Sequence, residues 1–465
     1  MKKYLVLFFG LFLIFISMSN VFSFAGGSGT QEDPYQISTW EELQNISSNP
    51  DSSYVLLNDL NSSTDGYGVY ASKDANAGKG WIPLGNDSNK FNGTFNGQNH
   101  TIADLFINRP NTDYVGLFGY ASENTNFSNI NVKDFNITGY QNVGGLIGRG
   151  EGDVYNSFSK GNITGERYYT GGLMGYSSGT VKNSFSKANV LGKDNNVGGL
   201  IGYTSGIVEN CFSTGNVTGE SYSTGGLIGH SGGNVNGCFS KANVTGNNRV
   251  GGLIGYSDEN TYDSFSIGIV SGSSSVGGLI GDNRGNVENC FWDVETSGKA
   301  SSDGGTGVST VEMKDRIIYE FGGWNISPSN NDLNNGYPYL GWQANNNSFT
   351  WFIQENDTLF AGGNGSLENP YQINDFKQLR NINLELDANY TLISDLNKSS
   401  DYYDVYASPN TGAEKGWFSI GDSSYIFTGS FKGQNHTIAD LFINRPNTDY
   451  VGLFGNVGNN VNISN

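Results

Sequence analysis

The sequence is poor in several residue types that define common classes of protein. Its 465 residues include 9 prolines, 3 cysteines and 3 histidines, and 25 lysines and arginines stand against 44 aspartates and glutamates. Scarce proline without a three-residue glycine period excludes collagen, and three cysteines are too few for a disulfide framework. A net charge of −19 argues against nucleic acid as a partner, because binding to phosphates requires a basic surface.

The chain also lacks a long hydrophobic run beyond its N-terminus. Two lysines precede an apolar run over residues 5–16, and a small-x-small sequence follows at 23–25. The run is shorter than the roughly 20 residues of a membrane span. Residues 1–25 are therefore predicted to be a signal peptide, with an uncleaved anchor as the alternative. We expect a secreted or cell-surface protein with no membrane span after signal cleavage.

Glycine and aromatic residues, in contrast, are abundant and periodic. There are 67 glycines, and 13% of the residues are aromatic, which is enough to form a core and excludes general disorder. Each repeat of 26 or 27 residues holds three short β-like stretches that end in glycine and leave no room for a helix. This pattern predicts an all-β fold, a parallel β-helix (solenoid) with small capping helices. Copies of the glycine-rich hexapeptide begin at Val143, Thr170, Val197, Thr224, Val250 and Val276.

Stacked coils would place equivalent residues in columns about 4.8 Å apart. We expect a phenylalanine column and a leucine column to fill the interior, and Asn156, Asn183 and Asn210 to form an amide ladder. Opposite charges in neighbouring coils support the register. The phenylalanine column comprises Phe158, Phe185, Phe212, Phe239, Phe265 and Phe291, and the expected ion pairs are Glu166–Lys193, Arg167–Asp194 and Lys182–Glu209.

A second periodicity relates the two ends of the chain. Residues 25–129 align with 361–465, and residues 97–119 are identical to 433–455, which indicates duplication with a truncated second unit. Capping boxes predict helices after Ser38 and after Ser309. The open edge of the second unit suggests end-to-end self-association. The predicted regions are a signal peptide (1–25), an N-terminal cap with the first strands (26–114), β-helix coils (115–300), a C-terminal cap (301–345), a linker (346–360) and the truncated second unit (361–465).

Together these features resemble GLUG-motif repeat proteins. The resemblance rests on the Gly-Gly-Leu-Ile-Gly repeats, on the shorter coil at 116–119 and on the flanking segments 91–102 and 290–340. It implies an exported, often surface-associated parallel β-helix, as in adhesin-like proteins and the non-catalytic part of some secreted proteases. The family supplies no catalytic residues, and the sequence has no His-Glu-x-x-His zinc motif. We therefore expect no enzyme activity, no catalytic residues and no metal ligands.

One column could bind a ligand. Tyr176, Tyr203, His230 and Tyr256 fall at one position of successive coils. Facing outward, their rings would suit the faces of sugars, so carbohydrate or a surface protein is the expected partner. A self-stacking ladder that only stabilises the coils is the alternative. Two other functions compete with adhesion: a polysaccharide lyase or hydrolase, and a non-catalytic scaffold of a larger surface protein.

The remaining features give weaker predictions. Asp258 with Glu259 and Asp293 with Glu295 could bind Ca²⁺, although solvated turns are the better interpretation, and no cofactor is expected. Cys211 and Cys238 lie in neighbouring coils and form either a disulfide or a buried thiol stack. An exported chain can be glycosylated at Asn-x-Ser/Thr sequons. The sequons here include Asn45, Asn136, Asn162, Asn216, Asn243 and Asn435.

Overall fold

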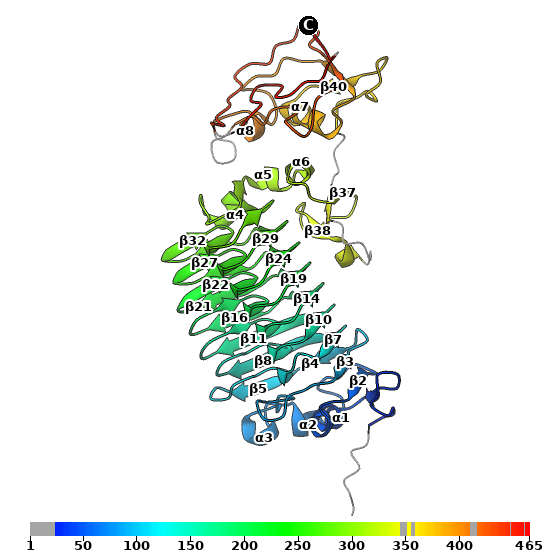
Figure 1. Ribbon diagram of the computed structural model, residues 1–465, viewed down its shortest axis with the longest axis vertical. Helices are drawn as coiled ribbons and strands as arrows, with labels where there is room; N and C mark the ends of the chain where they lie inside the picture. Colours follow the sequence, from blue (N-terminus) through cyan, green and yellow to red (C-terminus); the bar gives the residue numbers. More distant parts are fainter. Residues whose placement is uncertain (1–23, 345–350, 355–358, 410–415, 447, 460) are drawn as a thin grey trace, which may run out of the picture.

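The computed structural model describes residues 24–344, 351–354, 359–409, 416–446, 448–459 and 461–465. Parallel strands stack coil upon coil along the long axis of the molecule (Figure 1), so the predicted parallel β-helix is confirmed. Apart from its last two residues, the predicted signal peptide lies outside the described residues. None of the helices in the described ranges is both long and apolar enough to cross a membrane.

One coil illustrates the path of the chain through the solenoid. It begins with β14 (Val181–Lys182) in a ten-stranded sheet and continues with β15 (Phe185–Ser186) and β16 (Asn189–Gly192) in a fourteen-stranded sheet. It then passes through β17 (Val197–Gly198) in a five-stranded sheet and β18 (Ile201–Thr204) in a seven-stranded sheet. Every strand of this coil pairs in parallel with its equivalent in the next coil.

The other strands follow the same scheme. The ten-stranded sheet also contains β1 (Tyr35–Ile37), β2 (Ser53–Leu56), β3 (Thr94–Asn96), β7 (Asn126–Ser128), β10 (Asp153–Tyr155), β19 (Val208–Glu209), β24 (Val235–Asn236), β29 (Thr261–Tyr262) and β34 (Val287–Glu288). The fourteen-stranded sheet also contains β4 (Thr101–Ala103), β5 (Phe106–Arg109), β8 (Asn131–Gly139), β11 (Phe158–Gly165), β20 (Phe212–Ser213), β21 (Asn216–Gly219), β25 (Phe239–Ser240), β26 (Asn243–Thr245), β30 (Phe265–Ser266), β31 (Val270–Ser271), β35 (Phe291–Asp293) and β36 (Thr306–Val308). The five-stranded sheet also contains β12 (Thr170–Gly171), β22 (Tyr222–Gly225), β27 (Asn248–Gly251) and β32 (Ser274–Gly277). The seven-stranded sheet also contains β6 (Phe118–Ala121), β9 (Ile147–Gly150), β13 (Met174–Ser177), β23 (Ile228–Ser231), β28 (Ile254–Ser257) and β33 (Ile280–Asn283).

Short helices close the N-terminal end of the solenoid. They are α1 (Trp40–Asn45), the 3₁₀ helix η1 (Ile46–Ser48), α2 (Tyr67–Tyr70) and α3 (Ala75–Gly78). The capping box is present, but Thr39 rather than Ser38 is the N-cap residue and Glu42 is its partner. Trp40 and Trp81 are fully buried beneath these helices, so the cap covers the apolar edge of the first coil.

Paired glycines allow the chain to turn tightly inside each coil. The leucine column is fully buried, as predicted. In the four middle pairs the second glycine faces an inward serine: the Ser213 hydroxyl donates to the Gly226 carbonyl at 2.6 Å, and a Cβ at Gly172 would overlap the Ser186 hydroxyl. The motif therefore reflects a close approach between two sides of the coil, for which any side chain is too large.

The phenylalanine column is outside the solenoid, so the prediction that it fills the interior is wrong. Side chains alternate between the two faces of a strand, and in β15 the fully buried residue is Ser186 while Phe185 is only half-buried. The rings still stack on one another, with centroids 4.6 Å apart for Phe185 and Phe212 and 4.8 Å apart for Phe212 and Phe239. Their burial comes from a later part of the chain.

That cover is the C-terminal cap of the first unit. Its elements are α4 (Val294–Ser297), α5 (Thr310–Met313), α6 (Arg316–Phe321), η2 (Gly341–Ala344) and a three-stranded sheet of β37 (Ile326–Ser329), β38 (Tyr339–Leu340) and β39 (Trp351–Gln354). The predicted capping box of Ser309 and Glu312 is confirmed at the start of α5. The rings of Trp342 and Trp351 lie 5.6 and 5.7 Å from those of Phe212 and Phe265 respectively, so the cap folds back along the outer face.

Strand β39 lies within the segment 346–360, for which the sequence predicts a linker. Its side chains alternate, and Trp351 and Ile353 are buried at 4% and 1% exposure. Four residues give a weak strand signal on their own, and contacts with the phenylalanine column and with Trp324 of the cap bury them. The rest of the predicted linker includes 346–350 and 355–358, which lie outside the described residues.

Polar columns hold neighbouring coils in register. The predicted ion pairs are confirmed: the ammonium nitrogens of Lys193 and Lys182 lie 2.7 and 2.8 Å from carboxylate oxygens of Glu166 and Glu209, and Arg167 is 3.9 Å from Asp194. In the predicted amide ladder, Asn183 donates to Asn156 at 3.3 Å, but the Asn183 Oδ1 has no hydrogen-bond partner among the described residues, so the ladder does not extend to Asn210. The register inferred from charge alternation is therefore correct.

All three cysteines are free and buried, so the thiol stack, not the disulfide, is present. The amide of Cys211 donates to the sulfur of Cys238 at 3.4 Å. Burial raises the pKa of the Cys290 thiol to about 12 and holds the pKa of Cys238 well above its ordinary value. Since the thiolate is the reactive form, these side chains are chemically protected in the folded state.

We expect none of the three thiols to react with a disulfide reagent such as DTNB at pH 8 in the native protein, and all three to react after unfolding in guanidinium. The release of thionitrobenzoate at 412 nm measures this directly. Labelling of native protein faster than its unfolding would contradict the buried stack.

The second unit repeats the first steps of the solenoid. A four-stranded parallel sheet of β40 (Tyr371–Ile373), β41 (Asn389–Leu392), β42 (Ser430–Lys432) and β43 (Asn462–Ser464) has the same order as β1, β2, β3 and β7. Its capping helices are α7 (Phe376–Asn381), η3 (Ile382–Leu384) and α8 (Tyr403–Tyr406). Trp417 is fully buried, like its counterpart Trp81, so the duplicated sequence carries a duplicated cap.

Candidate functional site

The predicted aromatic column lies on the seven-stranded sheet. Tyr176, Tyr203, His230 and Tyr256 occupy β13, β18, β23 and β28 and are direct partners in the parallel register. The residue directly after each column residue, such as Thr204 after Tyr203, is fully buried, and successive side chains of a strand point to opposite faces, so the column side chains project outward. The structure thus brings the four residues together on one face.

The rings of the column stack on each other. The Tyr176 and Tyr203 centroids are 5.2 Å apart with an interplanar angle of 17°. His230 meets Tyr203 at 4.8 Å and Tyr256 at 4.6 Å, both in edge contacts. The sequence predicts that flat ring faces are open to a ligand. Because the rings pack against each other, the middle of the column instead presents ring edges and polar tips to solvent.

Two carboxylates, which the sequence analysis missed as part of this column, lie at its ends. The Tyr120 hydroxyl and Arg149 contact Glu151 at 2.7 and 2.8 Å. The Tyr256 hydroxyl donates to Asp258 at 2.9 Å. Each carboxylate follows a column residue by two positions, and that spacing is the signal that could have identified them. We call Tyr120, Arg149, Tyr176, Tyr203, His230 and Tyr256 the tyrosine strip.

Asp258 links two coils at one end of the strip. Its second oxygen lies 2.8 Å from Nε2 of His230, in the preceding coil, and Arg284 is 3.8 Å away. Burial alone would raise the pKa of the Asp258 carboxyl, but the hydrogen bonds from His230 and Tyr256 outweigh it and hold that pKa below its ordinary value. The group is a charged anchor for its neighbours.

Guanidinium groups cover the ring faces at both ends. Arg149 lies 4.6 Å from the Tyr176 ring centroid, and Arg249 lies 4.3 Å from that of Tyr256, at distances typical of cation–π contacts. Tyr256 retains only 5% exposure. The accessible middle of the strip is therefore formed by Tyr176 and Tyr203, whose hydroxyls have no hydrogen bond to any described residue.

The carboxylates considered for Ca²⁺ have protein partners instead. Asp258 is engaged by His230 and Tyr256, and buried Asp293 accepts hydrogen bonds from the Thr310 and Tyr337 hydroxyls. Across the described ranges, no group of three or more His, Cys, Asp or Glu side chains could hold a metal ion. The donor sets at these positions therefore give no support to a calcium site.

Comparison with known proteins bears on the repeats themselves. The family model described as "The GLUG motif" matches residues 139–164 and 194–218. The chain carries GLUG-motif repeats. This match confirms the resemblance seen in the sequence. The two matched segments contain Arg149 and Tyr203 of the tyrosine strip.

Two curated relatives of the GLUG-repeat chain match over part of its length. One, provisionally named a Gly-rich membrane protein, is from Evansella cellulosilytica, with 32% identity over 33% of this chain and 17% of its own. The other is halomucin from Haloquadratum walsbyi, with 35% identity over 30% of this chain and 2% of its own. The chain spans less than a fifth of either relative.

A solved structure, provisionally named an immunoglobulin A1 protease from Bacteroides ovatus, is also similar. The comparison covers 69% of this chain and 95% of that chain, with 20% sequence identity and a TM-score of 0.46.

Proposed function

We propose that this GLUG-repeat protein is exported to the cell surface and binds carbohydrate along the tyrosine strip without cleaving it. The observation that carries the proposal is the pair of hydroxyls of Tyr176 and Tyr203, which make no hydrogen bond to any described residue and lie one coil apart between the charged ends of the strip. The names of the two relatives, a membrane protein and a halomucin, support a place at the cell surface.

The geometry favours hydrogen bonding over ring stacking as the binding mode. The face of Tyr176 is taken up by Tyr203 and Arg149, whereas both hydroxyls are open. Hydroxyl groups both donate and accept, as do those of a sugar chain. A polymer lying along the solenoid would therefore meet donors and acceptors repeated at the coil spacing.

The test uses the full chain and a panel of neutral and acidic polysaccharides in affinity electrophoresis. The double variant Y176F/Y203F removes both hydroxyls while retaining the stacked rings. Each hydrogen bond contributes about 0.5–1.5 kcal/mol, so we expect the affinity for the retained polysaccharide to fall about tenfold.

Tyr222→Phe is the matched control, because Tyr222 is 53% exposed on β22 and lies outside the strip. It should bind like the wild type. Equal retention of the double variant and the wild type would refute the strip as the binding surface. Shortening of any polymer in the same incubations would instead establish the alternative, a polysaccharide-degrading enzyme.

A further inference from the structure

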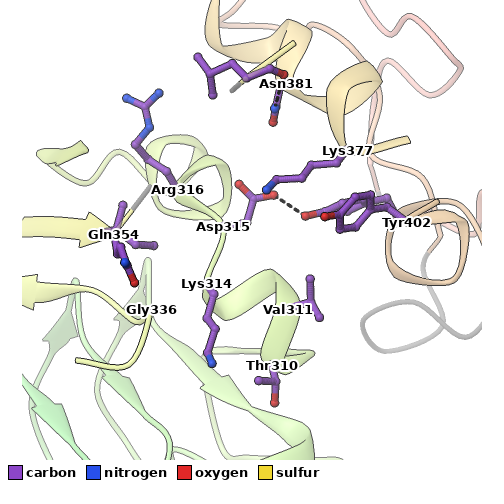
Figure 2. A pocket seen from close by; sticks show the side chains of 13 residues that line it. Thr310, Val311, Lys314, Asp315, Arg316, Gly336, Gln354, Lys377, Asn381 and Tyr402 are labelled. Atoms are coloured by element: carbon purple, nitrogen blue, oxygen red, sulfur yellow. Dashed lines mark hydrogen bonds between the residues drawn. The ribbon is translucent and has the colours of Figure 1, made fainter. Parts of the chain in front are cut away.

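The second unit docks on the C-terminal cap of the first. In Figure 1, α7 and α8 face α5 and α6, and Figure 2 shows Lys377 and Asp315 approaching each other from the two sides. The Tyr406 hydroxyl donates to the Asp315 carboxylate at 2.8 Å, and both side chains are buried, with 2% and 8% exposure. The joint therefore contains polar groups removed from water.

The duplicated caps differ at the surface that forms this joint. Three residues of the first cap, Glu41, Gln44 and Ile82, are replaced in the second by Lys377, Arg380 and Phe418. In the first cap Glu41 is exposed and Ile82 is 45% exposed. The second cap has thus acquired two cations and an aromatic ring where it meets the first unit.

A cavity of about 390 Å³ lies in the joint. Arg380, Phe418 and Arg445 line it from the second unit, and Asn289, Phe291 and Thr306 are among its lining residues from the first. This volume falls within the range of pockets that hold small molecules. The lining combines guanidinium, hydroxyl and amide groups with aromatic rings.

Arg380 is a buried cation whose side chain makes no hydrogen bond within the part of the chain that the structure describes. It is 5% exposed, and its Nε meets no acceptor among the described residues. Its guanidinium carbon lies 5.4 Å from the Phe418 ring centroid and 5.3 Å from that of Tyr406. A buried charge of this kind is costly unless it is paired.

Arg445 supplies a second guanidinium on the same ring. Its Nε and Nη2 donate to the carbonyls of Trp417 and Gly416 at 2.9 and 3.1 Å, and its guanidinium carbon lies 4.7 Å from the Phe418 centroid. Burial, reinforced by the nearby charge of Arg380, lowers the pKa of Arg445 to about 10. The two cations thus destabilise each other in the absence of a shared anion.

The carboxylate of Glu312 cannot fully serve as that anion. Glu312 interacts electrostatically with both arginines, but its Oε2 already accepts from the amide and hydroxyl of Ser309 in the capping box, each at 2.9 Å. No ion pair joins Arg380 to a carboxylate in the described part of the chain. The hydrogen-bonding capacity of Arg380 is therefore available to a ligand.

We propose that the cavity between the two units binds a small molecule bearing a carboxylate, with Arg380 as its anion ligand and Arg445 beside it. Guanidinium groups bind carboxylates through paired hydrogen bonds. Thr306 and Asn289 can bind hydroxyls on the rest of the molecule, and Phe291 can pack against its apolar side. The site belongs to the joint and is independent of the tyrosine strip.

The test measures binding of sodium D-glucuronate to the full chain by isothermal titration calorimetry at constant ionic strength. We expect saturable binding that D-glucose, which lacks the carboxylate, does not reproduce. Sodium acetate tests whether the site recognises the carboxylate alone. An affinity for acetate equal to that for glucuronate indicates a site for any small carboxylic acid, and a weaker affinity indicates a site for an acidic sugar. Arg380→Gln should reduce glucuronate affinity at least tenfold.

Arg380→Gln is compatible with the fold, because glutamine occupies the equivalent position 44 of the first cap. Arg109→Gln is the matched control: Arg109 holds the carbonyls of Trp81 and Gly80 as Arg445 holds their counterparts, but lies outside the joint. It should bind glucuronate like the wild type. Absence of saturable binding in the wild type, or equal affinity in Arg380→Gln, would overturn the proposal.

Discussion

Replacing Gly225 with alanine is expected to destabilise the solenoid strongly, although the change adds only one methyl group. A Cβ at this position would overlap the Ile228 carbonyl oxygen and lie 2.6 Å from the amide nitrogen of Gly255, in the next coil. Both obstacles are backbone atoms in hydrogen-bonded strands, so neither can move aside. We expect the free energy of unfolding to fall by more than about 4 kcal/mol, measured by urea denaturation followed by circular dichroism.

The matched control is Gly68→Ala. Gly68 lies in α2, and a Cβ there would meet no atom within 4 Å. Alanine favours helix over glycine by about 1 kcal/mol, so this variant should be as stable as the wild type or slightly more so. If both variants unfold at the same urea concentration as the wild type, the close approach of the coils at Gly225 is not a requirement of the fold.

Asp293→Ala is expected to release the C-terminal cap. The Asp293 side chain is fully buried and accepts four hydrogen bonds, from the amides of Glu295 and Thr296 and from the hydroxyls of Thr310 and Tyr337, at 2.7 to 3.0 Å. Losing a helix cap and leaving two buried hydroxyls unpaired costs about 3–5 kcal/mol. Because the cap covers the phenylalanine column, the fluorescence of Trp342 and Trp351 should report its release at lower urea concentrations.

Two variants separate this role from a general effect of lost charge. Tyr337→Phe removes one of the four bonds and should cost about 1–1.5 kcal/mol. Asp303→Ala removes an exposed aspartate from the same cap, which accepts from the Asn283 amide at 2.7 Å, and should cost less still. Equal losses in all three variants would show that Asp293 does not organise the cap.

The repeat in the sequence determines most of what can be predicted about the fold. The spacing of Val197 and Thr224 gives the coil length, and Lys193 with Glu166 gives the register, because parallel strands bring equivalent residues together. The same periodicity predicts the buried leucine column, which the structure confirms. Periodicity of this kind fixes which residues are neighbours along the axis.

Periodicity does not say which face of a strand points inward. Phe185 and Ser186 recur equally regularly, and hydrophobicity alone assigns the phenylalanine to the core. The structure reverses this assignment because the paired glycines leave room inside only for a small side chain. The outer rings are covered by Trp342 and Trp351, which lie 86 to 157 residues later in the chain. The decisive contacts are long-range and leave no local pattern.

The candidate site was predictable to the same extent. Tyr176, Tyr203, His230 and Tyr256 were identified from one column, and the structure places them together. The local sequence predicts a solvated turn for Asp258, because its partner His230 is in the preceding coil and 28 residues away. Ring orientation also required the structure, since the same spacing permits open faces or mutual stacking.

Because equivalent coils stack in parallel, the number of coils can change without any change in the caps at the two ends. A coil such as residues 198–224 contacts its neighbours through the same register on both sides, so its removal would join Val197 to Gly225 and leave the local pattern intact. Each coil adds about 4.8 Å, while the caps and the joint stay as they are. Gain or loss of whole coils would therefore change the distance between the two caps in fixed increments, while the caps themselves stay the same.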